Sequence, residues 1–289
     1  LLQVSFFLIG MGGGAINGAT NALAADIAQG SKSAKLSLLG VFFGIGALGM
    51  PLMMGILSKI WNYETIIFAV GCAIMLPAIY FLRIRFPEPK QKQGFPVKEG
   101  LSLLREPLLI LIGMILFLES GMEGMVSNWT TTFLADRSFP VDIALYALSF
   151  QVAALVLARF ILARLLVRLS PMLILTICLS MVISGAFLLY TGTTYILVII
   201  AMVLTGFGFA AGFPVMLGIT GERYAHLSGT AFSIVIIMAL IGNTVLNYLT
   251  GVLSHTLGIG FFPLQLMVCA GAMIILLRIV VVRFKWDKA

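Results

Sequence analysis

Two glutamates four residues apart lie in an otherwise apolar stretch of this chain and are its clearest candidates for chemistry. Glu119 and Glu123 share one face of a predicted helix, because side chains at this spacing are neighbours on a helix surface. Counted from Leu108, they lie about 16–23 Å along that helix. Burial and mutual repulsion both oppose ionisation, so at least one carboxyl is expected to hold a proton at neutral pH. The pair is our candidate for proton coupling; the alternative is a protonated glutamate that hydrogen-bonds a neighbouring helix.

An amide and an aromatic ring follow the two glutamates on the same stretch. Asn128 offers hydrogen-bond donors and an acceptor that suit hydroxyl groups. Trp129 offers an aromatic face, on which the C–H faces of a sugar can stack. Trp129 is equally explained as a residue of the aromatic belt at a membrane surface. With Glu123, these two residues form the first part of a predicted substrate-binding set.

Further amides within apolar stretches complete that set. Asn17 and Asn21 are four residues apart, as are Asn243 and Asn247, so each pair shares a helix face. Gln151 lies about nine residues from the end of its stretch, a depth at which it can face a central cavity. Polar groups inside membrane helices are costly and mark binding sites or helix contacts. We predict that all five residues bind substrate; a helix–helix contact is the alternative for each pair.

Three charged residues lie nearer the ends of their stretches. Asp26 and Glu222 occupy equivalent positions in two stretches, and Arg159 lies inside a third. Such residues cap helices or form ion pairs at a membrane surface. We therefore predict that Asp26, Arg159 and Glu222 are gating or rim residues on the inner side, where they do not touch substrate.

The elements that position these residues are long apolar helices. Each stretch has about 20 residues or more, which suffices to cross a hydrocarbon core of roughly 30 Å. Strand alternation with turn signals is absent, and helices satisfy their own backbone hydrogen bonds in lipid. The chain is thus predicted to be an all-α polytopic membrane protein. Its nine predicted spans are 1–26, 36–58, 64–83, 107–134, 142–168, 171–191, 193–221, 228–254 and 262–282.

Charge sets the predicted orientation. Of the 18 Lys and Arg residues, all but four fall in alternate gaps between spans; the exceptions are Lys59, Arg137, Arg159 and Arg278. By the positive-inside rule the charged gaps are cytoplasmic, and so is the C-terminus. The net charge of +7 is then an orientation signal, which speaks against nucleic-acid binding. Nine spans would place residue 1 outside, and the chain opens on Leu-Leu-Gln inside an apolar run, so we expect an N-terminal part to be missing.

An internal repeat supports this expectation. Shifted by 196 residues, Gly10 falls on Gly206 and Gly46 on Gly242. The shift carries the first three spans onto the last three in the same orientation, as in transporters built from parallel repeats. The intact protein would then have twelve helices. We predict the second half of an N-terminal six-helix bundle over 1–83, a cytoplasmic linker over 84–106 and a C-terminal six-helix bundle over 107–289.

Three short motifs carry a resemblance to a known transporter family. Residues 121–129, Gly-Met-Glu-Gly-Met-Val-Ser-Asn-Trp, resemble G-x-E-x-x-x-x-x-W in that family's seventh helix. Ala158-Arg159, followed by Arg164 and Arg168, resembles a G-R run of the eighth helix, with Ala in place of Gly. Residues 206–214, Gly-Phe-Gly-Phe-Ala-Ala-Gly-Phe-Pro, resemble the tenth helix's glycine-rich stretch. The chain is similar to helices four to twelve of the major facilitator superfamily, and within it to the fucose and glucose/galactose permeases.

The resemblance implies a major facilitator fold and proton-coupled sugar transport. One departure affects the coupling. Where the fucose permease has a Glu linked to proton coupling in its fourth helix, this chain has Asn17, while Asn21 matches the family's Asn. An Asn cannot release a proton, so Glu123, Glu119 or an acid outside this sequence would have to serve, and sodium coupling stays open.

The predicted function is secondary active import of a monosaccharide by proton symport in a bacterial inner membrane. The alternative is a drug or metabolite exporter working by proton antiport, whose cavity should be more apolar than this Asn-rich set. An enzyme is not expected, because the sequence has no Ser/His pair, acidic metal cluster or His-Asp acyltransferase pattern. We expect no cofactor and no metal; the expected partners are a sugar, a proton and membrane lipid, and the protein is expected to be a monomer.

Overall fold

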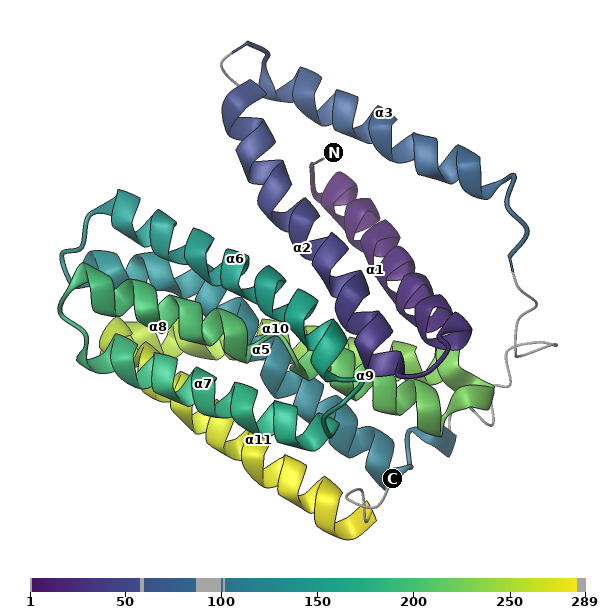
Figure 1. The fold of residues 1–289 in the computed structure, drawn as a ribbon. Coiled ribbons are helices and arrows are strands. Elements are labelled where there is room, and N and C mark those ends of the chain that lie inside the picture. The colour runs from purple at the N-terminus through teal and green to yellow at the C-terminus, as the bar shows by residue number, and fades with distance from the viewer. Residues whose placement is uncertain (1, 58–59, 87–99, 101, 285–289) are drawn as a thin grey trace.

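The computed structural model describes residues 2–57, 60–86, 100 and 102–284, and in this part of the chain it contains helices and turns but no strand (Figure 1). Within the described residues, eight helical stretches are long and apolar enough to cross a membrane; the first of the nine predicted spans, 1–26, forms a helix but is not among these eight. The predicted all-α polytopic architecture is therefore confirmed. The helices are α1 (Leu2–Ile27), α2 (Lys32–Leu57), α3 (Tyr63–Phe81), α5 (Pro107–Asp136), α6 (Val141–Leu165), α7 (Pro171–Thr191), α8 (Tyr195–Gly208), α9 (Gly212–Arg223), α10 (Ser228–Leu257) and α11 (Phe262–Phe284).

Local sequence signals fix several helix ends. Pro107 and Pro171 occupy the first positions of α5 and α7, where a missing N–H costs nothing. The Ser170 hydroxyl accepts a hydrogen bond of 3.3 Å from the Leu173 N–H, which caps α7. Gly258 ends α10 at φ +82°, a conformation that favours glycine. These signals explain why the helices begin close to the predicted span boundaries.

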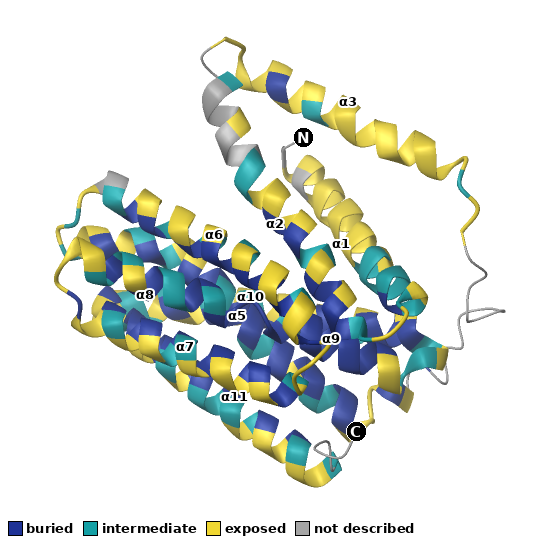
Figure 2. Ribbon diagram, viewed as in Figure 1, coloured by how far each residue is buried: buried dark blue, intermediate teal, exposed yellow. Residues whose placement is uncertain are grey.

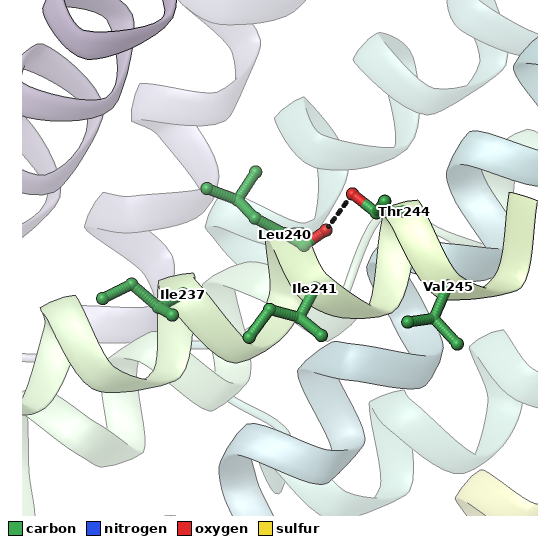
Figure 3. Close-up of a pocket in the computed structure, with 5 residues that line it drawn as sticks. All are labelled: Ile237, Leu240, Ile241, Thr244 and Val245. Atoms are coloured by element: carbon green, nitrogen blue, oxygen red, sulfur yellow. Dashed lines mark hydrogen bonds between the residues drawn. The ribbon is translucent and has the colours of Figure 1, made fainter. Parts of the chain in front are cut away.

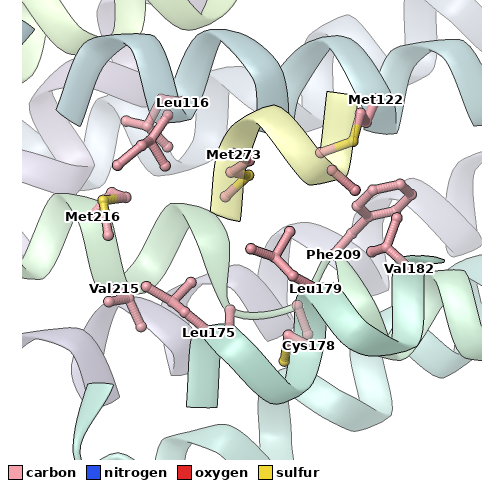
Figure 4. Packing of buried hydrophobic residues seen from close by; sticks show 14 of the residues in the cluster. Leu116, Met122, Leu175, Cys178, Leu179, Val182, Phe209, Val215, Met216 and Met273 are labelled. Carbon is pink, nitrogen blue, oxygen red and sulfur yellow. The ribbon is translucent and has the colours of Figure 1, made fainter. Parts of the chain in front are cut away.

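Helices α5 to α11 pack into one bundle around a continuous apolar core (Figures 2 and 4). Fully buried side chains such as Leu116, Met122 and Phe209 fill it. Along the seam between α5 and α10, glycines allow a close approach. A Cβ at Gly121 would meet Leu246, and one at Gly242 would meet the backbone of Phe117. Small residues at helix contacts bring backbones together in this way in membranes.

The seam gives a direct stability prediction. We expect Gly242→Ala to destabilise the protein by about 1–3 kcal/mol, because the new methyl group would overlap the Phe117 carbonyl and force the helices apart. Gly271→Ala in α11 is the matched control, since a Cβ there has no neighbour within 4 Å. Thermal unfolding in detergent measures both; an equal melting temperature for the two variants would contradict the prediction.

The predicted span 193–221 corresponds to one stretch long and apolar enough to cross a membrane, Tyr195–Arg223, but the helix within it is interrupted. Helix α8 ends at Gly208 and α9 begins at Gly212, with Phe209 to Ala211 fully buried between them. Pro214 has no N–H to offer the Ala210 carbonyl, so the regular hydrogen-bond ladder cannot run through this point. Because the break is enclosed by the bundle, its irregular backbone is kept away from lipid.

The described side chains of α1 and α2 contact the bundle near one of its ends. We call this the linker end; it is the end at which α1 finishes and α2, α5 and α10 begin. Figure 1 shows α2 converging with α6 there and diverging from it toward the opposite end. Gly40 and Gly44 of α2 lie against Arg159 and Val156 of α6. Helix α3 lies apart, and among its described residues Ile66 is the one buried side chain (Figure 2).

The helix boundaries follow the internal repeat. The shift that places Gly10 on Gly206 also places Lys32, the first residue of α2, on Ser228, the first residue of α10. It carries α1 onto α8 and α9 together. The repeat seen in the sequence thus corresponds to equivalent structural elements.

Candidate functional site

Helix α5 carries the two glutamates, and the structure gives them different surroundings. Glu119 is 1% exposed, and its carboxyl lies against Gly212 at the start of α9. Glu123, one turn further along α5, is half-buried. Arg159 of α6 and the Cys178 thiol of α7 are within electrostatic range of Glu119. The two predicted proton-coupling residues are therefore neighbours, but only Glu123 is partly open to its surroundings.

A chain of amides links α5 to α10 beyond the glutamates. The Asn128 side chain donates to Asn247 Oδ1 at 3.0 Å. Asn247 Nδ2 in turn donates to the Asn243 carbonyl at 2.8 Å, and Asn243 Nδ2 donates to the Ser120 carbonyl at 2.9 Å. The absence of a side chain at Gly124 makes room for both α10 amides. Three residues predicted to bind substrate are thus brought together, with Asn128 exposed and the other two half-buried.

Trp129 lies next to this amide chain. Its ring is half-buried, and a Cβ at Gly251 of α10 would lie in van der Waals contact with it. One face of the α5–α10 pair therefore combines a partly exposed aromatic ring with amide groups. This is the combination that a polyhydroxylated ligand needs, since rings contact its C–H groups and amides bond its hydroxyls.

The remaining predicted binding residues lie on other elements. Asn21 donates to Asn17 Oδ1 at 2.6 Å on α1, with Asn17 exposed and Asn21 half-buried. Gln151 of α6 is 1% exposed, and its backbone carbonyl lies against Gly206 of α8. Its side-chain Oε1 has no hydrogen-bond partner. The structure thus places Gln151 within the bundle, where it does not join the amide chain.

The predicted rim residues fall at the linker end, where α1 and α2 meet the bundle. Asp26 accepts a 3.1 Å hydrogen bond from Ser228. Arg159 donates to the Gly40 carbonyl at 3.3 Å, and its own carbonyl accepts from Ser37 at 2.7 Å. Glu222 is exposed. Hydrogen bonds thus link Asp26 to α10 and Arg159 to α2 at this end.

A hollow of about 300 Å³ on the outer face of α10 is apolar and lies apart from these polar groups (Figure 3). The repeat relates it to the α2 face that packs on α6, since Leu240 corresponds to Gly44. We therefore interpret it as a surface for helix packing. Its lining residues are Ile237, Leu240, Ile241, Thr244 and Val245.

Two features of the site were missed from the sequence. One is the enclosed break between α8 and α9, and the other is the contact of Glu119 with Gly212. The run of Gly and Pro over 206–214 was the available signal for the break. Among the described residues, the structure has no group of three His, Cys, Asp or Glu side chains that could hold a metal ion.

Comparison with known proteins identifies the family. The family model described as Major Facilitator Superfamily matches residues 1–247. The chain resembles the crystal structure of a Major Facilitator Superfamily transporter, FucP, in the outward conformation, with a TM-score of 0.80 at 18% identity over 95% of this chain and 75% of that one. The crystal structure of a variant of the E. coli fucose:proton symporter FucP matches with a TM-score of 0.78 at 19% identity, again over 95% of this chain and 75% of that one. No curated protein matches. On the family match, which covers most of its length, the chain belongs to the Major Facilitator Superfamily.

Proposed function

We propose that this chain belongs to a secondary transporter that imports a monosaccharide together with a proton. The observation that carries the proposal is the face shared by α5 and α10, on which Trp129 adjoins the amides of Asn128, Asn243 and Asn247. Glu123 lies between one and two turns earlier on α5. The likeness to a fucose:proton symporter agrees with it, although identity near 18% bears on the fold alone.

In this proposal the sugar binds between the two halves of the transporter. Trp129 stacks on the C–H face of the sugar, and the α5–α10 amides bond its hydroxyls. Asn17 and Asn21 contribute from α1, which meets α10 and α9 near the linker end. Gln151 supports the site from within the bundle. The two halves, 1–83 and 107–289 joined by the linker 84–106, rock about this centre.

Glu123 is the proposed proton carrier. A carboxylate is costly at this depth in a membrane, and binding a proton removes the charge before the loaded transporter turns over. Glu119 is the second acid of the coupling pair. The linker end is proposed to be cytoplasmic, as the distribution of Lys and Arg predicts. Asp26 and Arg159, which contact the partner half there, are then gate residues; Glu222 lies beside them.

The test uses the full-length protein in proteoliposomes. Uptake of labelled glucose, galactose and fucose is followed with and without an inward proton gradient. Gradient-stimulated uptake of any of these sugars is the expected result. Absence of uptake for all of them would overturn the sugar assignment and favour the alternative, export of a drug or metabolite by proton antiport.

A further inference from the structure

Glu119 occupies a position that neither its sequence environment nor a role in the sugar site explains. It is 1% exposed, and its Oε1 has no hydrogen-bond partner. The carboxyl lies against Gly212, the first residue of α9, and the Cβ of any other residue at that position would collide with it. A buried acid is thus aimed at a helix end through a gap that only glycine leaves open.

The start of α9 is suited to an anion. Its N-cap residue is Ala211, whose side chain makes no capping hydrogen bond. The N–H groups of Gly212 and Phe213 have no partner within the helix, Pro214 has no N–H, and the aligned peptide dipoles give this end a partial positive charge. An ionised Glu119 is therefore attracted to α9 more strongly than a protonated Glu119.

The other end of α9 holds the two halves together at the linker end. Gly218 lies against the Ser33 backbone and hydroxyl. The Gly221 carbonyl accepts a 2.6 Å hydrogen bond from Lys32 Nζ, and Gly221 also packs on Ala25. One short helix thus has Glu119 at its first residue and the contact between halves near its last.

We propose that Glu119 controls the linker-end gate through α9. In this proposal, attraction between ionised Glu119 and the start of α9 keeps α9 in the position that closes the gate. Protonation of Glu119 removes this attraction and allows α9 to separate from α1 and α2. The charged and titratable groups that act on Glu119 are Glu123 on α5, Arg159 on α6 and Cys178 on α7, together with the amide end of α9. The inference deepens the proposed function, because it rests on a proton as the coupling ion.

The test measures the gate directly in the full-length protein in lipid nanodiscs, without sugar. Spin labels are attached at Gln29→Cys and His226→Cys, two exposed positions on either side of the gate. Cys72, the exposed native cysteine, is replaced by Ser, while Cys178 and Cys269 are buried. Distance distributions from pulsed electron paramagnetic resonance then give the ratio of closed to open gates at acidic and at mildly alkaline pH.

The unmodified gate should be mostly closed at alkaline pH and open progressively as the pH falls. Glu119→Gln, a neutral side chain of the same shape, should lower the closed-to-open ratio at alkaline pH by about 5- to 30-fold and remove its pH dependence. Gly212→Ala should lower the ratio in the same direction while keeping the acid, because its methyl group displaces the carboxyl from α9.

Two controls separate this effect from general damage. Gly271→Ala, a helical glycine with free space around it, should leave the ratio unchanged. Glu123→Gln should keep a pH-dependent gate. A pH-dependent gate in Glu119→Gln, or equal effects of Gly212→Ala and Gly271→Ala, would overturn the inference. Failure of sugar uptake with the gate behaving as expected would instead overturn the proposed function alone.

Discussion

Glu123→Gln is expected to abolish accumulation of sugar against its gradient while leaving sugar exchange in place. One proton moving down one pH unit supplies about 1.4 kcal/mol, which drives about tenfold accumulation in a tightly coupled symporter. Glutamine keeps the size and hydrogen-bonding capacity of the side chain but cannot bind and release a proton. The accumulation ratio should therefore fall to about one, measured with labelled sugar in proteoliposomes under an inward proton gradient.

Exchange of labelled for unlabelled sugar across the same membranes is the second measurement for this variant. It needs no net proton movement, so it should persist. Glu64→Gln is the matched control, since Glu64 is an exposed acid in the first turn of α3 and should leave accumulation unchanged. Full gradient-driven accumulation by Glu123→Gln would show that the proton binds elsewhere.

Hydropathy and charge were sufficient to predict most of the fold. The apolar stretch 171–191 was predicted to be a span, and α7 runs from Pro171 to Thr191. Apolar length alone fixes such helices, since backbone groups in lipid must be bonded within the segment. The break at Phe209 was not predicted, because Gly and Pro are tolerated inside membrane helices and only the packing of the surrounding bundle decides whether a helix is interrupted.

The candidate site was predictable where the contacts are local. Hydrogen bonds between Asn17 and Asn21 and between Asn243 and Asn247 follow from spacing within one helix. The bond from Asn128 to Asn247 joins two helices, so it depends on how α5 packs on α10. Helix spacing predicts which residues share a face, but tertiary packing decides what that face meets.

Tertiary packing also decides the surroundings of the two glutamates. Their spacing placed Glu119 and Glu123 on one helix face, and the sequence favoured Glu123, which alone of the two was predicted to bind substrate as well as a proton. In the structure the start of α9 covers Glu119, while Glu123 stays partly open. That difference assigns them separate proposed roles, one toward the gate and one toward the substrate.

Trp129→Ala is expected to weaken sugar binding about 10- to 100-fold, because covering an aromatic face contributes about 1.5–3 kcal/mol. Trp129→Phe keeps a ring and should lose less. Isothermal titration with the full-length protein measures the affinities. Since Trp129 also packs against the apolar core, thermal unfolding is measured in parallel to separate lost binding from lost stability. Trp61→Ala, which removes an exposed tryptophan after α2, is the control and should leave affinity unchanged. Unchanged affinity in a stable Trp129→Ala protein would assign the ring to the membrane surface and leave the amides of α5 and α10 as the binding groups.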